Sequence, residues 1–326
     1  MSECMSGGSK VLITDYPWGD VAIESAVLNP QGVEIVAAPD GRESTLAGLA
    51  GDVVAIAACW AKVTAVVIDA AAHCRHVARM GIGLDNIDVA HATSRRIVVT
   101  NVPDYCVGEV ADHAMALLLA CARNVGFFHH RIKRGEYDLK AGPAMHRLAG
   151  RTLGLIGFGK TAQAVYLRAR GFGFNVIASS ASGNDYGTGC RMVPLELLFS
   201  ESDLISVHAP LTPQTRRMIN RETLGQCRRG VFIVNTSRGG LIDEAALADA
   251  IRSGHVAGAG LDVFDPEPPD VGRTLFQEER VVATPHAAFV SEESVVELRE
   301  RMARQVLDVI QGRTPPDVVN GVMVGS

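Results

Sequence analysis

Three segments in the second half of the chain each carry reactive side chains directly after an apolar run. They are "VNTSRGGLID" (Val234–Asp243) with Arg238, "GLDVFDPEPP" (Gly260–Pro269) with Asp262, Asp265 and Glu267, and "TPHAAF" (Thr284–Phe289) with His286. Where apolar runs form parallel strands, their carboxyl ends meet at one edge of the sheet, and such folds bind ligands there. The three segments therefore predict a site that combines an arginine, a carboxylate and a histidine.

This combination suits the reduction of a 2-keto acid. Hydride transfer to the carbonyl produces an alkoxide, and the imidazole of His286 can supply the proton near neutral pH. A neighbouring carboxylate stabilises the imidazolium, and the two-pronged guanidinium of Arg238 can bind the carboxylate and carbonyl oxygens of the substrate better than a lysine. Taken singly, each side chain could instead be a surface charge or one of ten mostly structural histidines.

A glycine turn in "TLGLIGFGKTAQAV" (Thr152–Val165) predicts a dinucleotide site. Gly157, Gly159 and Ala162 match the pattern G-x-G-x-x-G/A between an apolar run and a helical stretch. The first glycine allows the tight turn, the second lets the backbone approach the pyrophosphate, and the third small residue lets the helix pack on the strand. Glycine turns also occur for packing reasons, so this prediction depends on the strand expected before the turn and the helix expected after it.

The elements that must position these residues alternate between short apolar runs and amphipathic stretches, which predicts an α/β fold with parallel sheets. The first series of expected strands is Lys10–Thr14, Val33–Ala37, Asp52–Ile56, Ala65–Ile68 and Arg96–Thr100. The second series is Thr152–Gly157, Phe174–Ala178, Asp203–His208, Val231–Thr236, Gly258–Val263 and Arg280–Thr284. Two further stretches are expected to be helices: Cys106–Asn124 as a buried connector, and Ser291–Gly312 with Ser291 as its cap. We therefore expect two doubly wound domains.

Composition narrows the class of partner. The 326 residues carry a formal net charge of -5 without a basic block, which argues against a nucleic-acid surface or a polybasic membrane patch. The longest apolar runs are shorter than the ~20 residues that a transmembrane helix needs. Seven cysteines in no C-x-x-C spacing, and an N-terminus unlike a signal peptide, favour a cytoplasmic protein without disulfides or zinc. A small-molecule partner is expected.

The quoted motifs, together with "RMGIGLDNIDV" (Arg79–Val89), resemble the D-isomer-specific 2-hydroxyacid dehydrogenase family over nearly the whole chain. The stretches "LRARGFGFNVIA" and "RGGLIDEAALADAI" most resemble its branch of C-terminal-binding protein corepressors. Phosphoglycerate dehydrogenases and glyoxylate/hydroxypyruvate reductases are near neighbours. The resemblance implies a Rossmann cofactor domain, residues 102–291, inserted into a discontinuous flavodoxin-like substrate domain, residues 1–101 and 292–326. It also implies a homodimer whose interface is formed largely by the connector helix and Gly126–Asp138.

The resemblance further implies roles for individual residues. Arg238, Glu267 and His286 are expected to be catalytic. The substrate carboxylate is expected to bind backbone N–H groups at Ile82 and Gly83, with Arg79 nearby and Arg238 as a second substrate contact. Asp262 is expected to contact the nicotinamide carboxamide. The remaining residues expected to bind NAD or NADP are Gly157, Phe158, Gly159, Lys160, Thr161, Ala162, Ser179, Ser180, His208, Ala209, Pro210, Thr215, Thr236, Ser237 and His286. No metal site is expected, because the adjacent His129 and His130 cannot face one ligand from a helix.

Two residues depart from the family pattern. Ser180 stands where an acid usually binds the ribose 2'-hydroxyl, which leaves the choice between NAD and NADP open. Phe289 stands where the corepressor branch carries tryptophan, three residues after His286. The sequence therefore predicts an NAD(P)-dependent reductase of 2-keto acids. Phosphoglycerate dehydrogenase or glyoxylate/hydroxypyruvate reductase activity, and a non-catalytic dinucleotide-sensing scaffold, remain as alternatives.

Overall fold

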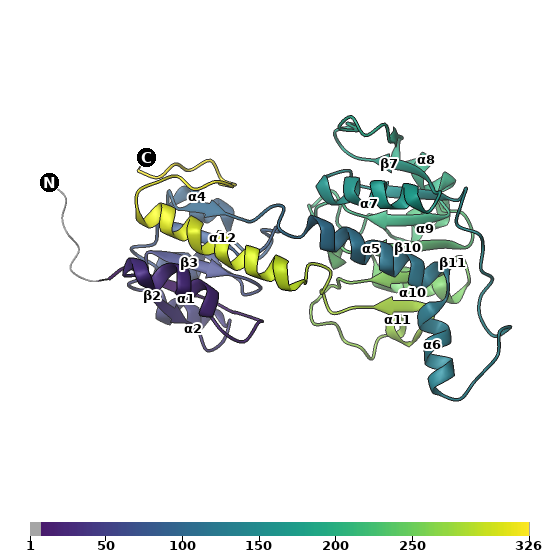
Figure 1. The fold of residues 1–326 in the computed structure, drawn as a ribbon, viewed down its shortest axis with the longest axis horizontal. Coiled ribbons are helices and arrows are strands. Elements are labelled where there is room, and N and C mark those ends of the chain that lie inside the picture. The colour runs from purple at the N-terminus through teal and green to yellow at the C-terminus, as the bar shows by residue number, and fades with distance from the viewer. Residues whose placement is uncertain (1–7, 326) are drawn as a thin grey trace. The chain divides into compact units, whose positions relative to one another are not determined.

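The computed structural model describes residues 8–325, and the chain divides into two compact units (Figure 1). The first unit comprises Met1–Tyr105 and Ser291–Ser326, and the second comprises Cys106–Val290. The boundaries expected from the sequence were after residues 101 and 291. In the described part of the chain, no helix is both long and apolar enough to cross a membrane.

The first unit contains a five-stranded parallel sheet in the order β2-β1-β3-β4-β5. Its strands are β1 (Lys10–Ile13), β2 (Glu34–Ala37), β3 (Ala55–Ala58), β4 (His76–Arg79) and β5 (Val98–Thr100). This strand order is that of flavodoxin-like sheets. All four residues of β3 are buried because helices cover both faces of the sheet, and a continuous apolar run is typical of such a strand.

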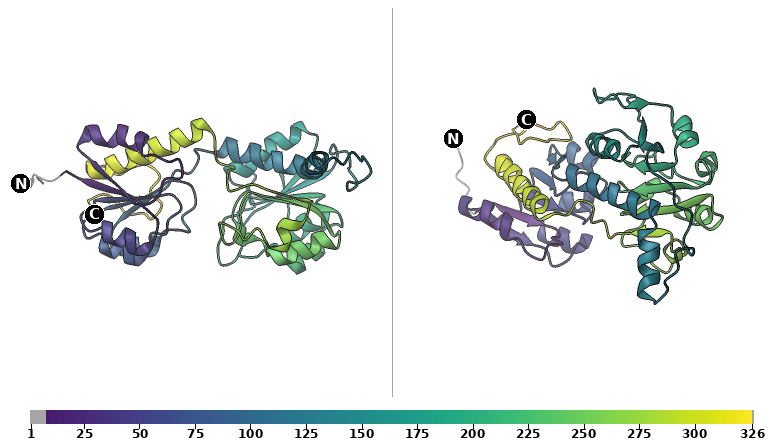
Figure 2. Two further views of the ribbon diagram at one scale, coloured as in Figure 1. Left: turned by 90° about the horizontal axis from the view of Figure 1, so that it is seen from below. Right: turned by 45° about the vertical axis from the view of Figure 1, so that its right-hand side comes forward.

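Helices α1 (Ala22–Leu28) and α12 (Glu292–Ile310), with the short 3-10 turn η1 (Asn29–Gln31), lie on one face of this sheet (Figure 2). Helices α2 (Glu43–Leu49), α3 (Ala65–Ala70) and α4 (Val89–Ser94) lie on the other. Arg299 of α12 donates to both carboxylate oxygens of the fully buried Glu24 of α1, at 2.8 and 2.7 Å. The C-terminal helix is thus an integral part of the first unit.

The second unit contains a seven-stranded parallel sheet in the order β12-β11-β10-β9-β6-β7-β8. Its strands are β6 (Thr152–Ile156), β7 (Asn175–Ser179), β8 (Arg191–Met192), β9 (Leu204–Val207), β10 (Val231–Asn235), β11 (Val256–Leu261) and β12 (Val281–Ala283). Numbered from β6, this is the Rossmann order extended by one strand, with its switch point between β6 and β9. The prediction of two parallel α/β sheets is confirmed.

The helices of the second unit also cover both faces of its sheet. Helices α5 (Val107–Ala122) and α7 (Lys160–Gly171) lie on one face, and α8 (Leu195–Glu201), α9 (Arg221–Gln226) and α10 (Glu244–Arg252) lie on the other (Figure 2). The remaining elements are α6 (Val125–Lys133), the 3-10 turn η2 (Gly239–Leu241) and α11 (Thr274–Gln277). Gly260 lets α5 approach β11 closely, because a Cβ there would lie 2.8 Å from the Cβ of Leu117.

Three predictions of local structure were wrong. Ala65–Ile68, expected as a strand, forms most of helix α3, because four apolar residues do not distinguish a strand from a buried helical turn. Strand β4 was missed because His76 and Arg79 at its ends look like surface residues, although both are buried. The two-residue strand β8 was also missed. Ser291 does cap α12, since its Oγ accepts the amide of Ser294 at 2.9 Å.

Candidate active site

Glu267 and His286 form a hydrogen-bonded pair in the second unit. The Nδ1 atom of His286 lies 2.8 Å from Oε2 of Glu267, while Oε1 of Glu267 accepts the amide of Phe264 at 2.9 Å. Burial raises the pKa of Glu267, but the hydrogen bond and charge of His286 lower it by a larger amount together with smaller contributions. The pKa of Glu267 therefore lies below its ordinary value. The carboxylate is therefore ionised near neutral pH. It orients the imidazole so that Nε2 is the atom that can exchange a proton.

Asp262, directly after β11, holds the segment that contains His286. Its oxygens accept the amides of Ala287 and Ala288, both at 2.9 Å, and the hydroxyl of Thr284 at 2.5 Å. Its backbone carbonyl accepts the amide of His286 at 2.8 Å. The side chain of Asp262 is fully buried, so these contacts make it a support of the His286 loop. Its contact with a nicotinamide carboxamide stays a prediction.

The loop of Arg238 is fixed by the residue at the end of β10. The buried amide of Asn235 accepts the N–H of Ser237 at 3.0 Å and donates to the carbonyl of Arg238 at 2.9 Å. The next residue, Gly239, approaches Phe264 so closely that a Cβ would overlap the backbone of Phe264. This contact brings the Arg238 loop against the segment that leads to Glu267. The guanidinium of Arg238 contributes to the lowered pKa of that carboxyl.

The glycine turn has the geometry that a dinucleotide requires. Gly157 has a φ of +87°, and a Cβ on it would lie 2.7 Å from the carbonyl of His208. Among the described residues, no atom beyond the local backbone lies within 4 Å of the Cβ position of Gly159, at the N-terminus of the twelve-residue helix α7. The amides of Lys160, Thr161 and Ala162 begin this helix, so the open space adjoins the positive end of a helix dipole. The turn therefore fits a pyrophosphate.

The structure brings together several other residues expected to bind the cofactor. The amide of Gly157 donates to the carbonyl of Ser179 at 2.8 Å, at the ends of β6 and β7. The hydroxyl of Ser237 donates to Ala209 at 2.6 Å, and that of Thr215 donates to Pro210 at 2.7 Å. The first of these bonds joins the loops after β9 and β10, and the second stabilises the loop after β9. Phe158 is buried beneath the turn, where its ring meets that of Tyr166 edge to face.

Two further residues of this set differ in what they offer a ligand. The hydroxyl oxygen of Thr236 is buried without a hydrogen-bond partner among the described atoms, so its hydrogen-bonding capacity is unmet in this structure. His208 lies 2.9 Å from the hydroxyl of Ser206, and burial lowers its pKa to about 4. His208 is therefore neutral at physiological pH and can offer a hydrogen bond but no charge.

Ser180 follows β7 directly and is half-buried, with its hydroxyl 3.4 Å from that of Ser182. The acid in the following loop, Asp185, accepts the amides of Gly187 and Gly189 and so stabilises its own turn. Arg191, one of the two cations nearest in sequence, pairs with Glu201 at 2.9 Å. The end of β7 thus has neither a carboxylate at position 180 nor an unpaired Arg191.

Of the expected substrate residues in the first unit, Ile82 and Gly83 lie on the loop after β4, and Arg79 is the last residue of that strand. The amides of Ile82 and Gly83 donate to no group in the described part of the chain, whereas the carbonyl of Ile82 accepts the side chain of Asn101 at 2.8 Å. Arg79 is 6 % exposed, and a Cβ on Gly81 would lie 2.6 Å from its guanidinium. Arg79 therefore supports the loop from beneath, and its proximity to a substrate stays a prediction.

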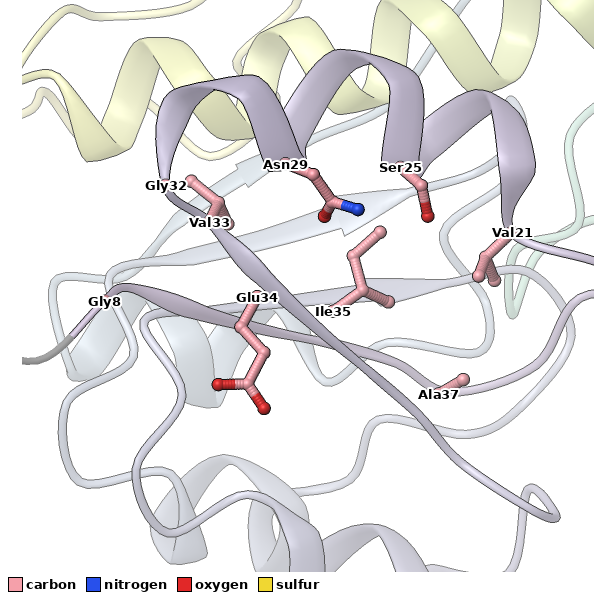
Figure 3. Close-up of a pocket in the computed structure, with 9 residues that line it drawn as sticks. All are labelled: Gly8, Val21, Ser25, Asn29, Gly32, Val33, Glu34, Ile35 and Ala37. Carbon is pink, nitrogen blue, oxygen red and sulfur yellow. The ribbon is translucent and has the colours of Figure 1, made fainter.

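A separate surface hollow in the first unit lies between α1 and β2 (Figure 3). Ser25 of α1 and Asn29 of η1 lie over Ile35 of β2, and the other lining residues are Gly8, Val21, Gly32, Val33, Glu34 and Ala37. None of the residues expected to bind substrate or cofactor lines this hollow.

Sequence reasoning missed the contacts that four residues make around the site. Asn235 and Gly239 belong to a quoted motif but signalled only a strand end and a turn. Thr284 also belongs to a quoted motif, and its hydrogen bond with His113 of α5 has no local signal because it joins distant segments. Phe289, noted as a departure from one branch, packs edge to face with His286, with ring centroids 6.3 Å apart.

Comparison with known proteins is consistent with this geometry. The profile of the NAD-binding domain of the D-isomer-specific 2-hydroxyacid dehydrogenases matches residues 115–288. A hydroxypyruvate reductase of Thermotoga maritima is 44 % identical over 251 residues, which is 76 % of this chain and 80 % of that protein. A D-3-phosphoglycerate dehydrogenase of Methanocaldococcus jannaschii is 37 % identical over 315 residues, which is 95 % of this chain but 59 % of that protein.

A solved structure extends the similarity to both units. The NADPH-dependent glyoxylate/hydroxypyruvate reductase of Sinorhizobium meliloti, in complex with NADP and malonate, has a TM-score of 0.86 and 28 % identity. The match covers 98 % of this chain and 99 % of that one. Similarity to the corepressor branch stays a prediction.

Proposed function

The chain belongs to the D-isomer-specific 2-hydroxyacid dehydrogenase family, and from this premise we propose that it reduces small 2-keto acids with Arg238, Glu267 and His286 as its catalytic residues. The family makes it an NAD(P)-dependent oxidoreductase that acts on the CH–OH group of 2-hydroxy acids. The observation that supports these roles is the 2.8 Å pair of His286 and Glu267, beside the arginine loop that Asn235 and Gly239 hold in place.

Each of the three side chains has one task in this proposal. Protonated His286 gives the proton of Nε2 to the carbonyl oxygen of the substrate, and Glu267 stabilises the imidazolium from the Nδ1 side. Arg238 binds and orients the substrate oxygens with its two-pronged guanidinium. The free amides of Ile82 and Gly83 are proposed to bind the substrate carboxylate. When it is bound, the reduced nicotinamide supplies the hydride.

Glyoxylate and hydroxypyruvate are the first substrates to test, because relatives named for these two acids resemble the chain closely. The experiment is a panel of glyoxylate, hydroxypyruvate, phenylpyruvate and phosphohydroxypyruvate, each measured with NADH and with NADPH. A preference for phosphohydroxypyruvate would favour phosphoglycerate dehydrogenase activity. If no 2-keto acid were reduced, the proposal would fail in favour of the non-catalytic scaffold.

The pH dependence tests the pairing of Glu267 with His286. The hydrogen bond and charge of His286 lower the pKa of Glu267, and replacing Glu267 by Gln removes the negative charge that stabilises the imidazolium in return. We expect the alkaline fall of the reductive kcat in E267Q to begin at lower pH than in the wild type. Because Asp265 pairs with Arg216 at 3.1 Å, D265N is the matched control and should keep the wild-type profile. Superimposable profiles of E267Q and the wild type would contradict the pairing.

The cofactor preference is proposed to follow from Ser180. An aspartate there would repel a 2'-phosphate by about 4 kcal/mol at ~4 Å under an effective dielectric of ~20, whereas serine exerts no such repulsion. We therefore expect NADPH to be used at least comparably to NADH. In S180D, the ratio of kcat/KM values should shift toward NADH by at least about tenfold. S200D, which adds the same charge near the C-terminus of helix α8, before the start of β9, should leave the ratio unchanged. The role of Ser180 would be contradicted if the wild type already preferred NADH strongly in kcat/KM and S180D left that preference unchanged.

We also propose a homodimer and a cytoplasmic location. Helix α6 and the residues that follow it carry three exposed apolar side chains. Ile132, Tyr137 and Leu139 are 53, 95 and 82 % exposed, which favours burial of this surface against a second copy. Sedimentation equilibrium measures the mass of the assembly directly. The cytoplasmic location rests on the sequence alone.

A further inference from the structure

His113 is a polar residue on the otherwise largely apolar helix α5, and it has no part in the function proposed above. Its Nε2 lies 2.9 Å from the hydroxyl of Thr284 and 3.5 Å from Oδ1 of Asp262. Thr284 is the first residue after β12, two positions before His286. His113 therefore contacts the segment that carries the predicted proton donor, although 171 positions separate it from Thr284.

The hydrogen-bond partners fix the direction of each bond. The hydroxyl of Thr284 donates its single proton to Oδ1 of Asp262 at 2.5 Å. The oxygen of Thr284 must then accept from the ring of His113, which places a proton on Nε2. This produces a directed chain from His113 through Thr284 to Asp262.

The chain ends on the backbone of the His286 loop. Asp262 accepts the two amides that follow His286, and its carbonyl accepts the amide of His286 itself. His286 has a φ of +51°, in the left-handed region that non-glycine residues rarely adopt. Such a conformation persists only where the surroundings determine it, and the hydrogen bonds to Asp262 do so here.

We propose that His113 is a positioning residue, which holds the His286 loop in its strained conformation through Thr284 and Asp262. The inference rests on the proposed function, since it assumes that His286 is the proton donor. It assigns His113 no contact with substrate or cofactor. Its effect should therefore fall on kcat rather than on the KM for the 2-keto acid or on cofactor affinity.

Two pairs of variants test the hydrogen-bond chain, one pair at His113 and the other at Thr284. H113L and T284V each remove one link, and we expect each to lower kcat at least about tenfold, because small misplacements of a reacting group are costly. H113Q and T284S retain a donor and a hydroxyl, and should stay within about threefold of the wild type. The double variant H113L/T284V should resemble either single variant, since both break the same chain.

A merely structural role would leave a different signature. It would lower the unfolding temperature and the fraction of protein that binds cofactor, but not kcat per bound cofactor, and Gln would not rescue activity. D112N on the same helix, which loses only an exposed pair with Arg168, is the matched control and should stay near wild type. A kcat of H113L within twofold of the wild type, or additive effects in the double variant, would overturn the proposal.

Hydrogen exchange separates this inference from the proposed function. The amides of Ala287 and Ala288 should exchange faster in H113L and T284V than in the wild type, and the rates should be restored in H113Q and T284S. This measurement requires no turnover. A wild type that reduces no 2-keto acid would overturn the proposed function, whereas unchanged exchange in an active enzyme would overturn the role of His113 alone.

Discussion

Replacing His286 by Asn is expected to lower the reductive kcat roughly a thousandfold, within the range that general acid catalysis contributes. Asn is the informative substitution because it tolerates the left-handed φ of +51° at this position. Its side-chain amide can also donate to Glu267 as Nδ1 of His286 does. The variant therefore keeps the loop and its bond to the acid, and loses only the proton of Nε2.

The measurement is kcat across the pH range with the best substrate of the panel. The residual activity of H286N should lack the alkaline fall that the wild type shows, because no imidazolium remains to be deprotonated. H255N is the matched control, since the ring of His255 hydrogen-bonds the carbonyl of Leu224 at 2.8 Å and His255 is not among the expected site residues, so little activity should be lost. A kcat of H286N within tenfold of the wild type would contradict the role of His286 as proton donor.

Replacing Arg238 by Lys is expected to lower kcat/KM about a hundredfold, a loss of roughly 3 kcal/mol in transition-state stabilisation. Lysine keeps the charge but lacks the planar pair of donors that can hold two substrate oxygens at once. Asn235 donates a hydrogen bond to the backbone carbonyl of residue 238, which the substitution does not change. The loop should therefore keep its conformation in R238K. The loss should therefore reflect the missing guanidinium.

The control for R238K is R273K, which changes an exposed arginine that pairs with Glu244 at 2.9 Å. Cofactor affinity, measured by nicotinamide fluorescence, should be unchanged in both variants. An R238K enzyme within threefold of the wild type would show that Arg238 does not bind the substrate through both donors.

The sequence alone predicted the architecture and the chemistry of the second unit. The six expected strands of the second series all exist within two residues of their bounds, because long apolar runs between turn signals are typical of buried parallel strands. The glycine turn was recognisable because its geometry depends on residues adjacent in sequence. Arg238 and His286 likewise follow β10 and β12, and a parallel sheet brings such ends to one edge.

The local pattern does not distinguish Glu267 from two nearby acids, and before the structure only the resemblance to the family singled it out. From composition, Asp262, Asp265 and Glu267 are equivalent carboxylates in one loop. In the fold, Asp262 is fully buried and holds the His286 loop, Asp265 pairs with Arg216, and Glu267 faces the imidazole. Which acid meets the histidine depends on the path of the loop, and no local pattern encodes that path.

Only the tertiary structure assigns the residues that hold the site in place. Gly239 is required by the backbone of Phe264, and His113 reaches Thr284 from a helix that precedes the glycine turn. The same reason explains the errors at β4 and α3: buried polar residues and short apolar runs take their state from distant neighbours. Local sequence thus determines which chemical groups lie at the strand ends, because the spacing of apolar residues and the residue types of turns are short-range properties. Hydrogen bonds and packing between segments far apart in the chain decide which of those groups meet and at what angle.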